Sequence, residues 1–235
     1  MKTISCQIQS LTSLTQHVYK VLLKPSEKVS FAPGQYLNFV MSDEDKRPFS
    51  IASSPNSELI ELQIGAFVAD SYPMQVIDRV KVSQDTGDSV TIEIPLGQAQ
   101  LREDSDRPLL LLAGGTGFSY IKSMFEYLAE QKSERQITVY WGVREASACY
   151  ELEETASIIA SLPNAKFIPV VENPTDDWQG KTGLVHKTVM EDISSLESYD
   201  IYLAGRFEMV GAVRTDFVAH GALLDHMYAD AFAFI

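Results

Sequence analysis

The chain has 235 residues, of which 45% are hydrophobic and 10% aromatic, enough for one large domain or two smaller ones with separate cores. Lys and Arg total 19 against 32 Asp and Glu, and the resulting net charge of −13 repels phosphate backbones and anionic membranes, so neither nucleic acid nor a membrane is an expected partner. The longest purely apolar run, residues 109–113, is far shorter than the roughly 20 residues of a membrane-spanning helix, and the start of the chain lacks a signal-peptide core, so we expect a soluble cytoplasmic protein.

Short strand-like segments fill the first part of the chain. They cover residues 3–10, 17–24, 35–41, 49–53, 59–66 and 89–95, with turn-forming residues such as "SDEDKR" and "SPNSE" between them. This spacing predicts a six-stranded antiparallel β-barrel. The segment "SYPMQVIDRV" (71–80) differs, because it suits a short helix or an irregular crossover that caps one end of the barrel.

Strands and helices alternate after the polar segment "GQAQLREDSDRP" (97–108). The predicted strands are 109–113, 137–142, 166–171 and 200–205, and the predicted helices are 118–131, 151–162, 185–193 and 207–221. Continuous apolar strands between amphipathic helices indicate a parallel sheet that is covered on both faces. We therefore predict a barrel domain over residues 1–100 and an α/β domain over residues 101–235.

The cysteines and histidines form no recognisable ligand pattern. Cys6 and Cys149 are too few for a disulfide framework, a CxxC pair or a four-thiolate cluster, and are expected to be small buried apolar residues. The four histidines show no HxxxH or HExxH spacing and have no cysteine nearby, so no metal site is predicted.

A glycine-rich turn follows the first strand of the α/β half, in "LLLLAGGTGFSYIKSMF". Without Cβ atoms, Gly114, Gly115 and Gly117 let backbone N–H groups and a helix N-terminus approach a pyrophosphate. Tyr120 stands where the common GxGxxG fingerprint has its last glycine, which argues against an ordinary dehydrogenase. A turn without a ligand is the alternative. The following helix is expected to pack into the core through Ile121, Met124, Phe125 and Leu128.

Two later strand ends carry weaker signals. In "YWGVRE", Arg144 could pair with a ribose 2′-phosphate and Glu145 could accept a hydrogen bond from a 2′-hydroxyl, so the choice between NADH and NADPH stays open. In "DIYLAGRFEM", Gly205 leaves room for a flat ring, and Arg206 and Phe207 begin the next helix where a phosphate or a ring could be met. Simple strand-to-helix packing is the alternative there.

Five motifs occur together in order, namely "RPFSIASSP", "LLAGGTGFS", "VYWG", "IYLAGRFEM" and the terminal "DAFAFI". With them the chain resembles the bacterial NAD(P)H:flavin oxidoreductases of the ferredoxin-NADP⁺ reductase superfamily, including the type that supplies reduced flavin to luciferase. The resemblance implies a flavin-binding barrel, a pyridine-nucleotide domain, and hydride transfer in the cleft between them.

The resemblance also implies roles for particular residues. Ser50 would be the catalytic residue, because a hydroxyl that both donates and accepts can follow the change at flavin N5. Arg47 would neutralise charge near the flavin ring or its phosphate, and Phe49 with Pro48 would shape the bed of the ring. Further implied flavin contacts are Tyr36, Gly65, Ala66 and Phe232. The implied nucleotide contacts are Gly114, Gly115, Thr116, Gly117, Phe118, Trp141, Arg144, Gly205, Arg206 and Phe207.

Each of these flavin-site residues also has a structural interpretation. Pro48 is common before an edge strand, Phe49 could be core, and Ser50 could satisfy a backbone group. The terminal residues 230–235 could cover the ring site through Phe232 or form a last buried strand.

Two departures from the superfamily bear on mechanism. Relatives that hold FAD tightly carry a compact GxxS-type turn, whereas "GAFVADSYPMQV" offers only Gly65 and the distant Ser71. We therefore expect a dissociable flavin substrate, riboflavin, FMN or also FAD, with NADH or NADPH as hydride donor. Reduced flavin would then serve a monooxygenase, luciferase, or ferric or cobalamin complexes. In addition, "AGRFEM" stands where many relatives have a Cys-Gly-Pro motif, so no cysteine thiol can assist at the nicotinamide. The alternative is a redox sensor or an electron-transfer subunit with tightly bound FAD and a protein partner.

Overall fold

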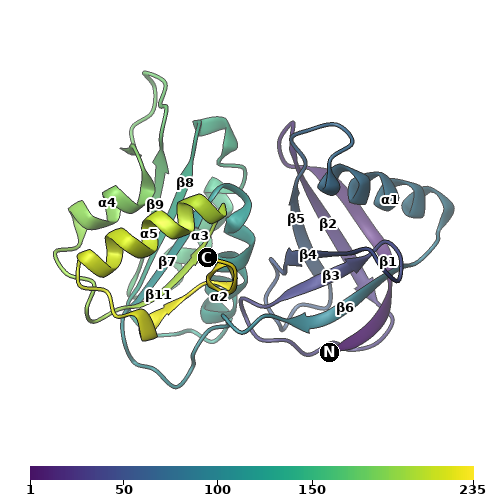
Figure 1. Cartoon of the computed structure of the whole chain (residues 1–235), viewed down its shortest axis with the longest axis horizontal. Helices are drawn as coiled ribbons and strands as arrows, with labels where there is room; N and C mark the ends of the chain where they lie inside the picture. The colour runs from purple at the N-terminus through teal and green to yellow at the C-terminus, as the bar shows by residue number, and fades with distance from the viewer.

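The computed structural model describes residues 1–235 and contains two six-stranded sheets that lie side by side (Figure 1). The first sheet comprises β1 (Lys2–Ser13), β2 (Val18–Pro25), β3 (Tyr36–Val40), β4 (Lys46–Ser50), β5 (Ile60–Gly65) and β6 (Val90–Leu96), in the order β4-β3-β6-β1-β2-β5. All its pairings are antiparallel. Its two edges meet where the Ala52 N–H donates to the Glu61 carbonyl at 2.8 Å, so the predicted antiparallel barrel is confirmed.

Helix α1 (Tyr72–Thr86) is longer than the short helix or crossover expected over residues 71–80. Its buried residues Val76, Ile77, Val80 and Ser83 follow helical spacing, and the first three belong to the barrel core. The exposed residues that follow position 80 concealed the last two turns from the sequence analysis. The helix is capped by Gly87, whose φ of 76° is a left-handed conformation that glycine adopts without strain.

The second sheet is parallel throughout. It comprises β7 (Leu109–Gly114), β8 (Ile137–Val143), β9 (Ala165–Val171), β10 (Lys181–Thr182), β11 (Asp200–Ala204) and β12 (Met227–Tyr228), in the order β10-β9-β8-β7-β11-β12. Helices α2 (Phe118–Glu130) and α3 (Leu152–Ala160) cover one face, and α4 (Val185–Asp192) and α5 (Phe207–Ala219) cover the other (Figure 1).

The apolar run of β7 supplies both cores of this sheet. Leu109 and Leu111 belong to the cluster under α2 and α3, while Leu110 and Leu112 belong to the cluster under α4 and α5. Because successive side chains of a strand point to opposite faces, a strand covered on both faces must be apolar at every position. The predicted two-sided α/β architecture is thereby confirmed.

The segment 97–108 connects the two sheets and touches both. The Leu101 N–H donates to the Pro33 carbonyl, and the Arg102 N–H donates to the Tyr202 hydroxyl at 2.8 Å. The division into residues 1–100 and 101–235 falls inside this segment and stays a prediction. None of the helices is long and apolar enough to cross a membrane.

Candidate functional site

A mostly apolar cavity of about 550 Å³ lies between the barrel and the α/β half. Its walls come from β3 and β4, from residues 97–99 of the connecting segment, from the start of α5 and from residues 227–234. It therefore brings together six predicted site residues from distant parts of the chain: Tyr36, Pro48, Phe49, Ser50, Phe207 and Phe232. An apolar cavity with a few polar groups is what a flat aromatic ligand requires.

The polar side of this cavity is set by the pairing of β3 with β4. Tyr36 stands directly opposite Ser50 in the ladder, so the two side chains share one face of the sheet. Gly97 follows β6 with a φ of 93°, and a Cβ there would come within 2.9 Å of the Tyr36 ring and 3.1 Å of Asp230. Only glycine lets the chain pass so close to these two side chains.

The chain end forms the opposite wall. Residues Asp230–Ala233 make a 3-10 turn, so the alternative of a last buried strand is wrong. Phe234 is 75% exposed and its ring lies 5.8 Å from that of Phe207, while the Arg214 guanidinium lies 5.1 Å from the Phe232 ring. Aromatic rings thus stand at the mouth of the cavity.

Asp230 is a cavity residue that the sequence analysis missed. It lines the cavity, and burial raises the pKa of its carboxyl, although hydrogen bonds from the backbone of Ala99 and Gln98 oppose the rise. In the sequence, its role is indicated only by its being the one ionisable side chain of the otherwise apolar segment "DAFAFI". A carboxyl with a raised pKa in a ligand cavity is a candidate functional group.

Arg47 lies behind the cavity wall and is not among its lining residues. It is only 6% exposed, and Asp45 binds its guanidinium through both carboxylate oxygens. The Tyr72 carbonyl and the Gln75 side chain accept two further hydrogen bonds at 2.7 and 2.8 Å. The structure therefore uses Arg47 to join β4 to α1 and leaves little of the guanidinium free for a phosphate.

The predicted glycine turn lies where β7 ends and α2 begins, and it packs against the end of β11. A Cβ on Gly117 would lie 2.5 Å from the Ala204 carbonyl oxygen, whereas a Cβ on Gly115 would meet nothing within 4 Å. Gly115 has a φ of 54°. The turn and Gly205, which follows β11, are thus brought together at the carboxyl edge of the parallel sheet, where such sheets bind ligands.

The other residues predicted to contact the nucleotide form one buried pair and one exposed pair. Phe118 and Trp141 are fully buried and their rings stack with centroids 4.0 Å apart. The Trp141 indole N–H donates to the Gly115 carbonyl at 2.9 Å, so this pair supports the turn from beneath and offers no side-chain surface to a ligand. Arg144 and Arg206 are exposed after β8 and β11 at the same edge of the sheet.

Gly65 and Ala66 lie apart from the cavity that contains Ser50. A Cβ on Gly65 would come within 2.9 Å of the Thr116 methyl group, so this glycine permits contact between the end of β5 and the glycine turn. Ala66 is buried, and its N–H donates to the His17 carbonyl at 2.7 Å. The structure therefore places Gly65 where the barrel meets the α/β half, and Ala66 in the barrel core.

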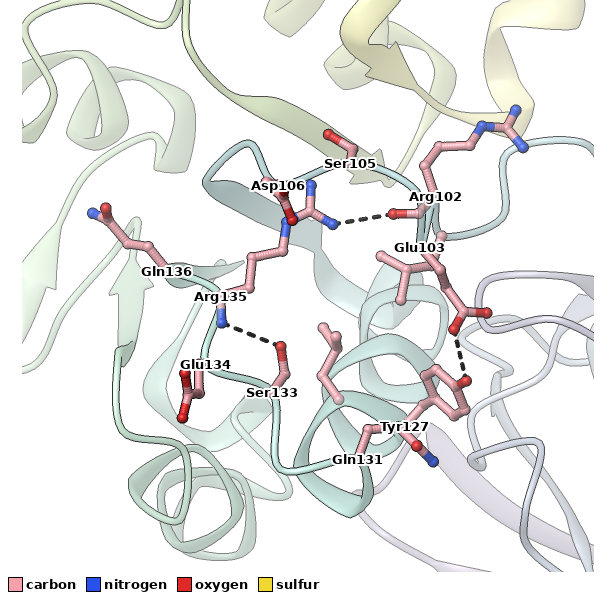
Figure 2. Close-up of a pocket in the computed structure, with 12 residues that line it drawn as sticks. Arg102, Glu103, Ser105, Asp106, Tyr127, Gln131, Ser133, Glu134, Arg135 and Gln136 are labelled. Atoms are coloured by element: carbon pink, nitrogen blue, oxygen red, sulfur yellow. Dashed lines mark hydrogen bonds between the residues drawn. The ribbon is translucent and has the colours of Figure 1, made fainter.

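A second, polar cavity of about 590 Å³ lies at the connecting segment, away from the predicted site residues (Figure 2). The Arg135 guanidinium donates to the carbonyls of Arg107 and Arg102 and to the Asp200 carboxylate, and the Tyr127 hydroxyl donates to Glu103 at 2.9 Å. These bonds attach the connecting segment to the α/β sheet, so Arg135 has a structural role at this cavity.

The family match and the whole-length relatives described next identify an oxidoreductase with a nicotinamide-nucleotide-binding domain. Residues 111–215 match the family described as the oxidoreductase NAD-binding domain. In fold alone, the chain is similar to a cytochrome P450 reductase of Amycolatopsis (24% identity, TM-score 0.84, 97% of this chain and 69% of that one). It is also similar in fold to the FAD/NAD-binding domain of a nitric oxide dioxygenase from Vibrio cholerae (21% identity, TM-score 0.81, 97% and 96%).

Sequence similarity is higher to two curated proteins. The chain is 45% identical over 236 residues to an NAD(P)H-flavin reductase of Vibrio harveyi, covering 99% of this chain and 100% of that protein. It is 44% identical over 235 residues to an NAD(P)H-flavin reductase of Aliivibrio fischeri, covering 99% of both. The chain belongs to the NAD(P)H-flavin reductase family.

Proposed function

We propose that this chain catalyses the NAD(P)H-dependent reduction of free flavins. The observation that carries the proposal is the apolar cavity whose walls come from both halves of the chain and whose barrel side presents Ser50 opposite Tyr36. The similarity to proteins named NAD(P)H-flavin reductase over their whole length supports the same activity.

The residues of this chain would bind, orient and shield the reactants. A bound nicotinamide supplies a hydride from C4, and a bound flavin accepts it at N5. Ser50 would hold N5 with its hydroxyl, which can act as donor or acceptor. Pro48 and Phe49 would support one face of the ring, and Phe207 with Phe234 would exclude water at the mouth of the cavity.

Several features favour a flavin that is bound through its ring and released after reduction. Helix α1 begins with Pro73 near its N-terminus, where a missing N–H leaves one donor fewer for a pyrophosphate. Arg47, the nearest buried cation on β4, is already neutralised by Asp45. Riboflavin, FMN and FAD would therefore be accepted through the part they share, with NADH or NADPH as donor.

The reduced flavin would pass to a second acceptor, a monooxygenase, luciferase, or a ferric or cobalamin complex. Because the expected substrates are intracellular coenzymes, we place the reaction in the cytoplasm, which cell fractionation would test. Exposed Arg144 would pair with the 2′-phosphate of NADPH at the nucleotide edge of the sheet.

One assay tests the proposal. The purified protein, examined first by its visible spectrum, is mixed with NADH or NADPH, and absorbance at the nicotinamide band is followed before and after riboflavin or FMN is added. We expect a nearly colourless protein that oxidises the nucleotide only once free flavin is present. Stoichiometric bound FAD, or an absence of flavin-dependent oxidation, would instead favour the electron-transfer subunit or the sensor.

A further inference from the structure

Six buried or half-buried polar side chains, five of them charged, join the two halves of the molecule at a place separate from the flavin cavity. We call them the interface cluster. The barrel contributes Lys20, Glu61 and Gln63 from β2 and β5, and the α/β half contributes Lys122, Glu126 and Glu151 from α2 and the start of α3. Lys122 is only 2% exposed and Glu151 only 5%. Removing charges from water is costly, so each must be held by close partners.

The contacts of the interface cluster cross from one half to the other. Lys122 binds Glu126 on its own helix and lies 3.4 Å from Glu61 of the barrel, and Lys20 of the barrel binds Glu151. The Glu126 carboxylate also accepts the Ser54 N–H at 3.0 Å. Hydrogen bonds and ion pairs are directional, so this interface permits less sliding between the halves than an apolar one would.

Gln63 is the centre of the interface cluster. Its side-chain amide donates to Glu61 at 2.8 Å and to Glu151 at 2.7 Å, and its carbonyl accepts from the Tyr150 hydroxyl at 3.0 Å. The orientation follows from chemistry, because carboxylates can only accept and the NH₂ group must face them. Burial raises the pKa of Tyr150 well above its ordinary value, which keeps the hydroxyl a donor.

A chain of contacts leads from Gln63 to the glycine turn. Tyr150 presents its ring edge-on to Trp141, with centroids 5.0 Å apart, and the Trp141 indole N–H donates to the Gly115 carbonyl. A second route runs along β5, where Gly65 follows Gln63 by two residues and lies against Thr116 of the turn. Both routes end at the element that would hold the nucleotide.

We propose that Gln63 is a positioning residue for the nicotinamide donor, because it holds the glycine turn of the α/β half in one place relative to the barrel. The inference rests on the proposed function, since it concerns where the nucleotide lies relative to the flavin site. Gln63 does not line the flavin cavity, so its effect on flavin binding is small while its effect on the nucleotide is large.

The variants Gln63→Glu and Gln63→Met test the proposal in two ways. The first places another carboxylate against Glu61 and Glu151, and the second removes the hydrogen bonds without adding charge. For both we expect the KM for NAD(P)H to rise about tenfold and kcat to fall, with the KM for riboflavin unchanged. Gln84 is an exposed residue of α1, so Gln84→Glu makes the same charge change away from the interface cluster. It should leave kcat and the KM values for NAD(P)H and riboflavin as in the wild type.

A double variant separates positioning from simple damage. Gln63→Glu combined with Glu151→Gln restores the number of carboxylates and one amide–carboxylate bond, so it should recover part of the nucleotide KM. Folded variants, verified by thermal denaturation, with wild-type nucleotide KM and kcat would overturn the proposal. So would equal increases in the KM for nucleotide and flavin.

Nucleotide affinity measured without flavin keeps this test distinct from that of the function. The Kd of NADPH, measured by its fluorescence, should rise in the Gln63 variants, and an unchanged Kd would count against positioning. A wild-type protein that binds NADPH but reduces no flavin would refute the proposed function and leave the Kd comparison to decide the role of Gln63.

Discussion

Asp45 binds the Arg47 guanidinium in a bidentate manner, with Nε to one carboxylate oxygen at 2.8 Å and the second nitrogen to the other oxygen at 2.5 Å. Arg47 also holds the pKa of the Asp45 carboxyl below its ordinary value, mainly through these hydrogen bonds. The arginine that the superfamily resemblance assigns to flavin or its phosphate is therefore already paired within the chain.

The first prediction concerns flavin choice. We expect wild-type KM values for riboflavin and FMN within a few-fold of each other, because Asp45 neutralises Arg47. In Asp45→Asn the guanidinium loses the carboxylate that neutralises it, and its uncompensated positive charge behind the cavity wall would lower the KM for FMN a few-fold relative to that for riboflavin. Steady-state kinetics with both flavins would show this. Glu44→Gln, which removes an exposed neighbouring charge, is the control, and an unchanged ratio in Asp45→Asn would contradict the prediction.

The second prediction concerns Ser50. Ser50→Ala should lower kcat about tenfold, since it removes one hydrogen bond of about 1 to 2 kcal/mol to the reacting ring, while the melting temperature stays within a few degrees of the wild type. Ser50→Thr, which keeps the hydroxyl, should retain more of the rate. A wild-type kcat in the alanine variant would remove Ser50 from the reaction.

The third prediction is a pH dependence of stability. The pKa of the Asp230 carboxyl is raised in the folded chain, mainly by burial, so the unfolded chain releases this proton at lower pH than the folded one. The contribution is fully present below the unfolded pKa and is lost as pH rises through the folded pKa. Asp230→Asn should therefore gain stability relative to the wild type as pH rises from 4 to 7.5. Denaturant titrations at both pH values measure this, and a variant that loses stability relative to the wild type between pH 4 and 7.5 would contradict it.

The fourth prediction contrasts two glycines of the same turn. In Gly115→Ala the new methyl meets open space and the cost is backbone strain at positive φ, about 1 to 2 kcal/mol, so the protein should fold and show a raised KM for the nucleotide. In Gly117→Ala the methyl would lie 2.5 Å from the Ala204 carbonyl oxygen, so the turn must shift and the melting temperature should fall much further. Similar melting temperatures for the two variants would refute this account.

Local sequence patterns were sufficient for most strands of the two sheets, but they missed the two-residue strands β10 and β12 and placed β4 at residues 49–53 instead of Lys46–Ser50. The run Leu109–Leu112 predicts a strand buried on both faces, and the strand does supply residues to both cores. The C-terminal part of α1 was missed because the exposed residues Lys81, Gln84 and Asp85 conceal its helical period, which is visible only once Val80 and Ser83 are known to be buried.

Residues of the site were less predictable where burial depends on distant partners. Glu61 and Lys122 are charged side chains, which normally lie at the surface, and no local pattern indicates that a strand and a helix 61 positions apart enclose them. Asp230 likewise gains its role only when the chain end folds against residues 97–99. Motif spacing identifies elements, whereas pairing between elements needs the folded chain.

The segment 97–108 is not a free linker, because it packs against both the barrel and the α/β half. Its first residues line the apolar cavity that contains Ser50, and the Arg102 guanidinium lies 5.2 Å from the Tyr228 ring of the last parallel strand. A cut after residue 96 would remove one wall of the cavity from the barrel, and a cut after residue 108 would remove the Arg102 and Arg107 carbonyls that accept hydrogen bonds from Arg135. The two halves of this reductase are therefore not readily exchanged for those of another protein. A chimera that joins this barrel to another nucleotide domain would have to keep the segment 97–108 and the residues of the α/β half that it contacts.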